Sequence, residues 1–205
     1  MTKIYFKTYG CTLNQSDTEH MKGLLQKAGF KIVNKIKSAD IIIVNTCTVK
    51  SSTENKILTY IKKINKLNKP IIVAGCIPQT DPEKLSGYSI IGTDQIHHIV
   101  EVVEETLNEN VVSLIATGEV PDLNLPVVRK NEVVEIVPIS RGCLGNCSYC
   151  KTKAARGNLI SHSEEKIIRR IRKSLNQGIK EVWLTSQDTG CYGFDLNTNL
   201  QKLLK

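Results

Sequence analysis

The chain has 205 residues, of which 40% are hydrophobic, and a formal net charge of +8 from 28 Lys and Arg against 20 Asp and Glu. This length and apolar content allow a sizeable buried core in one large domain or one and a half small ones. No run approaches the ~18 apolar residues of a membrane span, and no apolar stretch follows Met1 as in a signal peptide, so we expect a cytoplasmic protein without a membrane partner. The positive charge favours a polyanionic partner such as nucleic acid, although a Lys-rich solvated surface gives the same balance.

Strand and helix signals alternate through residues 1–115, which predicts an α/β domain with a parallel sheet. Two of the strands are continuous apolar runs, typical of strands that are buried on both faces. The first helix is expected over 16–29, with Ser16 or Asp17 as its N-cap and Glu19 as the capping-box partner. The expected elements are strand 3–10, helix 16–29, strand 39–47, helix 52–68, strand 69–76, strand 88–92 and helix 94–108.

A segment without periodicity, 116–132, contains two prolines and a glycine and is expected to be a linker. Residues 133–205 then start a second βα series. Its expected elements are strand 133–140, helix 163–178, strand 180–186 and the start of a helix at 197–205. These elements make two βα units.

Three cysteines each come directly after an expected parallel strand, in the contexts YGC, NTC and AGC: Cys11, Cys47 and Cys76. The carboxyl ends of parallel strands meet at one edge of a sheet, where ligands gather. We therefore expect the three thiols to converge on one compact cofactor. The alternative is three buried structural cysteines, since free cysteine is among the most buried residue types.

A second group of cysteines, Cys143, Cys147 and Cys150, has the spacing C-x3-C-x2-C in a loop between a strand and a helix. In a reducing compartment such cysteines bind metal or catalyse more often than they form disulfides. Iron–sulfur clusters and structural zinc both usually take four ligands, and only three are local here. Either one metal position stays open for another molecule, or His162 completes a Cys3His zinc site.

These motifs resemble a known family. The C-x3-C-x2-C spacing, with Tyr149 just before the third cysteine, is similar to the radical S-adenosylmethionine (AdoMet) motif. Together with TYGCTLNQSDTE, NTCTVK and AGCIPQ it resembles the N-terminal half of the MiaB/RimO-type radical AdoMet methylthiotransferases. The segments GCLGNCSYCKTKAARGNL and LTSQDTGCYG resemble the archaeal and eukaryotic branch of that family, which acts on N6-threonylcarbamoyladenosine of tRNA beside the anticodon.

The resemblance implies the cofactors and their sites. Two 4Fe-4S clusters are implied, one at Cys143, Cys147 and Cys150 with AdoMet on its open iron, and an auxiliary one at Cys11, Cys47 and Cys76. Tyr149 would lie by the adenine of AdoMet. Gln187 and Asp188 are candidates for contacting its methionyl group, unless they only cap the next turn. No catalytic residue beyond the cluster ligands is implied.

The resemblance also implies the reaction and the partners. The reaction would be methylthiolation at C2 of the modified adenine, with tRNA as substrate and an electron donor. The family's partial TIM barrel needs about six βα units, so the 205 residues are expected to be either a truncated product or one half of a split enzyme. In the second case, which is our hypothesis, a second polypeptide supplies the rest of the barrel and a TRAM-like domain. Six basic residues are candidates for holding the tRNA backbone, although the last three also fit a solvated helix face: Lys151, Lys153, Arg156, Arg169, Arg170 and Lys173.

Two alternatives stay open: a ribosomal-protein methylthiotransferase, and a non-enzymatic iron–sulfur or zinc fragment that binds RNA. Three further residues with metal-binding side chains are not expected to be ligands. Cys191 stands where a small apolar residue is expected, and His97 and His98 lie on an expected helix, where surface or packing roles are commoner.

Overall fold

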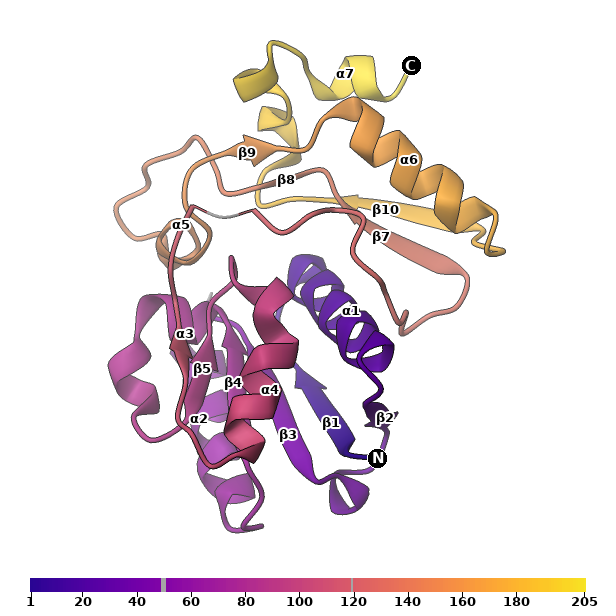
Figure 1. Cartoon of the computed structure of the whole chain (residues 1–205). Helices are drawn as coiled ribbons and strands as arrows, with labels where there is room; N and C mark the ends of the chain where they lie inside the picture. The colour runs from indigo at the N-terminus through magenta and orange to yellow at the C-terminus, as the bar shows by residue number, and fades with distance from the viewer. Residues whose placement is uncertain (49–50, 119) are drawn as a thin grey trace.

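The computed structural model describes residues 1–48, 51–118 and 120–205. Residues 49 and 50, at the end of the NTCTVK segment, and residue 119 of the expected linker lie outside the described residues. The chain forms two α/β parts that pack against each other, the N-terminal part below the other in Figure 1.

The N-terminal part is built on a parallel six-stranded sheet with the order β2-β1-β3-β4-β5-β6. Its strands are β1 (Lys3–Thr8), β2 (Lys31–Val33), β3 (Ile41–Thr46), β4 (Ile71–Gly75), β5 (Ser89–Ile91) and β6 (Ser113–Leu114). The parallel sheet confirms the expected fold class. The two short edge strands, β2 and β6, were not expected, because two or three residues are too few to show a periodic pattern.

Helices cover both faces of this sheet (Figure 1). They are α1 (Thr12–Lys27), α2 (Ser51–Asn65), α3 (Cys76–Thr80) and α4 (Ile99–Leu107). Alternate β3 side chains supply both cores, because successive residues of a strand point to opposite faces. Ile43 packs with α1 and α4 on one face, whereas Val44 packs with α2 and α3 on the other. Short 3-10 turns at 36–38, 82–85 and 96–98 complete this part.

The first helix begins at Thr12, so the expected N-cap at Ser16 or Asp17 is wrong. Cys11 is the N-cap residue, in an extended conformation, and Ser16 and Asp17 lie buried inside the helix. The helix starts earlier because of a contact with a distant part of the chain. Thr12 Oγ1 hydrogen-bonds Thr185 Oγ1 at 2.5 Å, across the boundary between the two parts, and such a contact leaves no mark in the local sequence.

The second part has a parallel pair of strands, β7 (Val134–Pro138) and β10 (Glu181–Thr185), covered by α6 (Glu164–Leu175). The strand–helix–strand order is the one expected for the start of a barrel. Apart from β7, β10 pairs with no other strand in the described part of the chain, and its Trp183 is 42% exposed. The smaller elements are β8 (Ser140–Arg141), α5 (Lys151–Arg156), β9 (Ile160–Ser161), two 3-10 turns at 189–191 and 194–196, and α7 (Leu200–Leu203).

The described residues of 116–132 form no helix or strand but lie against both parts. Val128 N donates to Glu19 O and Lys130 N to Glu19 Oε1, each at 3.0 Å. Gly23 of α1 lets this segment pass closely, because a Cβ there would lie 2.3 Å from the backbone of Pro126. The segment therefore fastens α1 to the second part.

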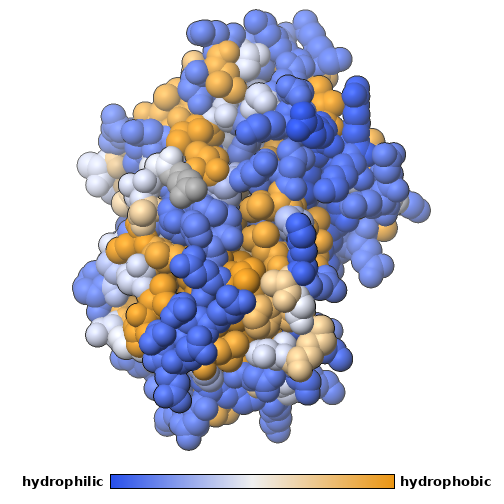
Figure 2. All heavy atoms as spheres, viewed as in Figure 1, coloured by the Kyte–Doolittle hydropathy of each residue, from blue (hydrophilic) through white to orange (hydrophobic). Residues whose placement is uncertain are grey.

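The face of the molecule drawn in Figure 2 is mostly hydrophilic, with small apolar areas. Within the described ranges, no helix has both the length and the apolar character that crossing a membrane requires.

Candidate metal and cofactor sites

The three N-terminal cysteines lie at one edge of the six-stranded sheet. Cys11, Cys47 and Cys76 follow β1, β3 and β4, which are neighbours in the sheet, at their carboxyl ends. Cys11 is exposed, and the other two are buried. The sheet order thus brings together residues that are far apart in the sequence.

Asn14, on the first turn of α1, ties two of these thiols together. Its Oδ1 accepts from Cys11 Sγ at 3.7 Å and from Cys76 Sγ at 3.8 Å. Its Nδ2 donates to Thr46 O at 2.6 Å and to Tyr9 O at 3.1 Å, so the amide is held from two strand ends. The sequence did not single out Asn14, although it stands three residues after a candidate ligand.

Glycines make the close approach of the strand ends possible. Gly10 has φ +105°, and a Cβ there would lie 2.8 Å from Cys47 Cβ. Gly75 has φ +95°, and a Cβ there would lie 2.6 Å from Thr46 O. Residues with a side chain rarely adopt these conformations, so both positions require glycine.

Electrostatics at this edge are shaped by burial and by Arg156. Burial raises the pKa of the Cys76 thiol, while the Arg156 guanidinium acts to lower it. Burial also works against the charge of Arg156, but Asp17 and Cys76 outweigh it and raise the pKa of Arg156. A nearby cation favours thiolates, the form in which cysteine binds metal.

The second cysteine group lies in the loop that leads into α5. Gly145 N donates to Cys143 Sγ at 3.3 Å, and Cys150 N donates to Cys147 O at 3.0 Å. A Cβ on Gly145 would lie 3.5 Å from Cys143 Sγ and 3.9 Å from Cys147 Sγ, so these two thiols flank the glycine. All three cysteines are at least partly exposed.

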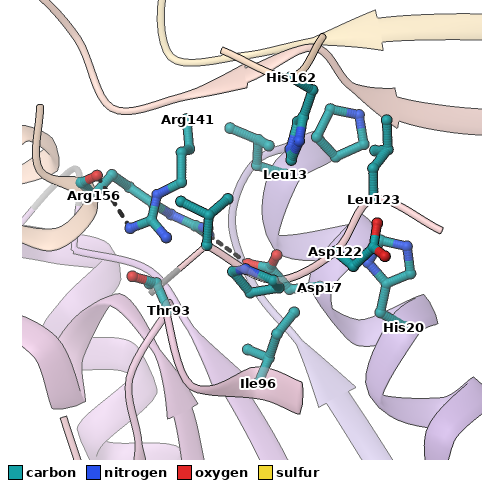
Figure 3. Close-up of a pocket in the computed structure, with 13 residues that line it drawn as sticks. Leu13, Asp17, His20, Thr93, Ile96, Asp122, Leu123, Arg141, Arg156 and His162 are labelled. Carbon is teal, nitrogen blue, oxygen red and sulfur yellow. Dashed lines mark hydrogen bonds and ion pairs between the residues drawn. The ribbon is translucent and has the colours of Figure 1, made fainter. Parts of the chain in front are cut away.

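No group of three His, Cys, Asp or Glu in the described ranges has a metal-ready arrangement. His162 lines the pocket of Figure 3 beside His20 and Leu123, and burial lowers its pKa to about 4. The fit to a metal centre therefore rests on residue type: cysteine thiolates are the ligands of iron–sulfur clusters, and three of them leave one iron of a 4Fe-4S cluster open.

Some of the buried polar atoms without a hydrogen-bond partner in the described residues lie just after the carboxyl ends of β7 and β10. They include Ser140 Oγ, Ser186 Oγ and Gln187 Oε1. Such atoms are unusual in a folded protein, so they suit a polar ligand. Ser140 and Ser186 were missed from the sequence because serine is common at strand ends.

The other cofactor candidates differ in position. Tyr149 is 87% exposed and has room to contact a ligand. Asp188 Oδ1 accepts from Gly190 N at 3.0 Å, so this carboxylate caps the following turn.

Two residues that were not expected to be ligands have partners within the protein. Cys191 is buried and donates from Sγ to Asp188 O at 3.1 Å. His98 Nδ1 lies 3.4 Å from Glu101 Oε2 on a partly exposed helix start, as expected for a surface histidine.

The two cysteine sites are joined by α5, which packs against α3. At its start, Lys151 Nζ forms ion pairs of 3.0 Å with Glu54 and Asp81 of the N-terminal part. At its end, Arg156 Nη2 forms an ion pair of 2.6 Å with Asp17. Figure 3 shows Arg156 and Arg141 entering the pocket between the two parts from the second part. Arg141 itself pairs with Asp94.

Two of the basic residues expected to hold tRNA are buried, which corrects the expectation for those two. Arg156 and Arg170 are buried, at 4% and 2% exposure, because each neutralises a buried carboxylate. Lys151 forms the ion pairs given above, and Lys153 Nζ donates to Cys143 O. Arg169 pairs with Glu165 on the exposed face of α6, and Lys173 is exposed.

Two family models match separate stretches of the chain. Residues 3–91 match the model described as Uncharacterized protein family UPF0004, and residues 137–203 match the Radical SAM superfamily. Threonylcarbamoyladenosine tRNA methylthiotransferase from Homo sapiens is 46% identical over 98% of this chain and 36% of that protein. The probable threonylcarbamoyladenosine tRNA methylthiotransferase from Pyrococcus abyssi is 43% identical over 100% of this chain and 49% of that protein. The chain thus spans less than half the length of these curated relatives.

Solved structures share the fold at low sequence identity. The radical AdoMet methyltransferase TsrM from Kitasatospora setae, solved with tryptophan and an AdoMet analogue, has a TM-score of 0.58 and 11% identity, over 93% of this chain and 48% of that chain. The cobalamin-dependent AdoMet radical enzyme OxsB has a TM-score of 0.57 and 15% identity, over 93% of this chain and 34% of that chain.

Proposed function

The chain belongs to the radical AdoMet methylthiotransferase family, and from that premise we propose that it carries the cluster-binding part of a tRNA methylthiotransferase. The substrate is N6-threonylcarbamoyladenosine beside the anticodon, and the methylthio group is placed on C2 of its adenine. The observation that carries the proposal is the placement of the six cysteines: three follow neighbouring strands of one sheet, and three lie in the loop before α5, which packs against α3.

Each cysteine group holds one 4Fe-4S cluster in this proposal. Asn14 and the two glycines support it at the N-terminal group, because they set the positions of the strand ends from which Cys11 and Cys76 project. The backbone N–H of Gly145 supports it at the loop, because it already donates to a ligand sulfur. When bound, the clusters and AdoMet supply the radical chemistry and the sulfur, while the protein supplies placement.

AdoMet binds at the carboxyl ends of β7 and β10. Ser186 and Gln187 hydrogen-bond its methionyl group, which satisfies their buried oxygens. Tyr149 lies along the adenine, because its ring is exposed to solvent and can contact a ligand. Asp188 acts indirectly by capping the turn that holds Gln187 in place.

Further strands pair with the open edge of β10 to complete the barrel. An unpaired strand edge exposes backbone N–H and C=O groups, and Trp183 exposes apolar surface beside them. In this proposal, these strands and a TRAM-like domain that holds most of the tRNA make up the remaining part of the enzyme. An electron donor and the tRNA complete the set of partners, and the cytoplasm is where they meet. Arg169 and Lys173 on α6, and Lys151 at the start of α5, are the exposed candidates for tRNA phosphates.

The test is mass spectrometry of tRNA from cells that lack the gene and carry a plasmid copy. The intact gene should restore the methylthio group on threonylcarbamoyladenosine, and Cys143→Ala should abolish it. Cys191→Ala is the matched control and should restore it fully. Failure of the intact gene to restore the group refutes the proposal, and a methylthio group on a ribosomal protein instead would favour the other branch of the family.

A further inference from the structure

Arg156 lies in the interior between the two cysteine groups. It ends α5, in the second part, yet its guanidinium reaches α1 of the N-terminal part. Nη2 donates to Asn14 Oδ1 at 2.8 Å and to Asp17 Oδ2 at 2.6 Å, and the side chain is 5% exposed. In Figure 3 the side chain points toward Asp17. Burial of an arginine this deeply requires partners, and both come from one turn of α1.

Asn14 Oδ1 is the atom that Arg156 shares with the N-terminal cysteines. The thiols of Cys11 and Cys76 contact the same oxygen, at 3.7 and 3.8 Å. Thiols that bind iron lose their protons and can no longer donate to this oxygen. Arg156 then remains as its donor, so the guanidinium lies one shared atom away from two ligands of the site.

A buried cation at this distance acts on the charge of a bound cluster. The one-electron reduction of an iron–sulfur cluster adds a negative charge, and a nearby positive charge stabilises the reduced form. Asp17 accompanies Arg156, but Arg156 bonds directly to the amide that contacts the thiols, whereas the structure gives Asp17 no such bond.

We propose that Arg156 is a positioning residue for the auxiliary cluster, which holds Asn14 against Cys11 and Cys76 and raises the reduction potential of the cluster through its charge. This inference rests on the proposed function, which places a cluster at that site. It also assigns a role to α5, because the helix that starts at the second cysteine loop delivers its last residue to the first cysteine site.

The test measures the potential of the auxiliary cluster alone. The chain with Cys143, Cys147 and Cys150 replaced by alanine is reconstituted anaerobically and titrated with dithionite under EPR. Arg156→Gln in this background should shift the midpoint potential downward, and Arg156→Lys should shift it less because it keeps the charge. Arg169→Gln is the control and should leave the potential unchanged.

The possible results separate the role of Arg156 from the proposed function. An unchanged potential in Arg156→Gln overturns the role of Arg156 but leaves the proposed function standing. If Arg156→Gln does not fold, Asp17→Asn removes the neighbouring negative charge and should raise the potential, and no shift there overturns the role equally. A triple-alanine background that binds no iron, while the intact chain does, removes the auxiliary cluster and with it both proposals.

Discussion

Arg170 shows how one residue can be misjudged from charge alone. Its side chain and that of Glu135 are each 2% exposed, and the ion pair between them is 2.6 Å long. Replacing Arg170 by Met leaves Glu135 buried with Arg129 as its only other cation, so we expect the free energy of unfolding to fall by about 3–5 kcal/mol. Urea denaturation followed by circular dichroism measures this loss.

The matched control is the preceding residue on the same helix. Arg169→Met removes an exposed ion pair with Glu165 and should cost about 0–1 kcal/mol. Equal losses for the two variants would contradict the assignment of Arg170 to the interior.

At the scale of single residues, the sequence predicted where the cysteines lie but not which charged side chains are buried. The places of the six cysteines, after strands or in one loop, were predictable because they are local features, while their role as ligands stays a prediction. The burial of Arg156 and Arg170 was not predictable. The local sequence of a helix does not show whether a buried carboxylate from another element lies opposite an arginine. Asn14 was missed for the same reason: its partners come from other strands.

The turn from β4 into α3 is an element whose shape depends on one glycine. Gly75 has φ +95° and ψ −140°, and its missing Cβ would meet Asn45 Oδ1 and Thr46 O. We expect Gly75→Ala to lower the free energy of unfolding by at least ~3 kcal/mol and to reduce iron bound at Cys76, because both strain and a backbone clash arise. Urea denaturation and iron analysis after reconstitution check the two effects.

Gly29→Ala provides the comparison. Gly29 has φ +91°, and a Cβ there would meet nothing within 4 Å, so only the backbone conformation opposes the substitution. The cost should be about 1–2 kcal/mol, with iron binding unchanged. A Gly75 variant that behaved like the Gly29 variant would show that the turn tolerates a side chain.

Elements were predictable where they are long and periodic. The strands and the longer helices follow from apolar runs and amphipathic spacing, as expected. The start of α1 was wrong by one turn, because the Thr12–Thr185 hydrogen bond and the packing of Leu13 decide it. Helix α5, which follows the cysteine loop directly, has too few residues for its period to be seen.

At the scale of the whole molecule, two histidines make stability depend on pH. His20 of α1 and His162 of the second part line the pocket between the parts, and burial lowers their pKa to about 3 and about 4. The unfolded chain therefore binds more protons below the ordinary pKa of 6.5, so stability present above that pH is lost as the pH falls through it.

Between pH 7 and pH 5 each histidine should remove about 2 kcal/mol from the free energy of unfolding. His20→Gln should reduce the difference between the two pH values by that amount, whatever its effect on stability itself. The charged groups that face His20 and His162 are Asp122, Arg141, Lys166 and Arg170. Urea denaturation at both pH values provides the measurement.

The way in which the two parts pack against each other could not be predicted from the sequence. Alternating strands and helices predict an α/β fold, and the aperiodic segment at 116–132 marks where one series stops. Nothing local predicts that this segment runs along α1, or that Lys151 reaches Glu54 and Asp81. These contacts depend on which surfaces meet, and they accompany the packing of α5 against α3.

Helix α1 serves both parts at once: it packs on the six-stranded sheet and also against β7. On a ribosome, the strands that carry the first three cysteines are synthesised well before the loop with the other three. The N-terminal part can then fold first and offer its surface to the second part while that part is still being synthesised. Vectorial synthesis thereby favours correct assembly, and dilution from denaturant, which releases all segments together, should recover native protein less efficiently.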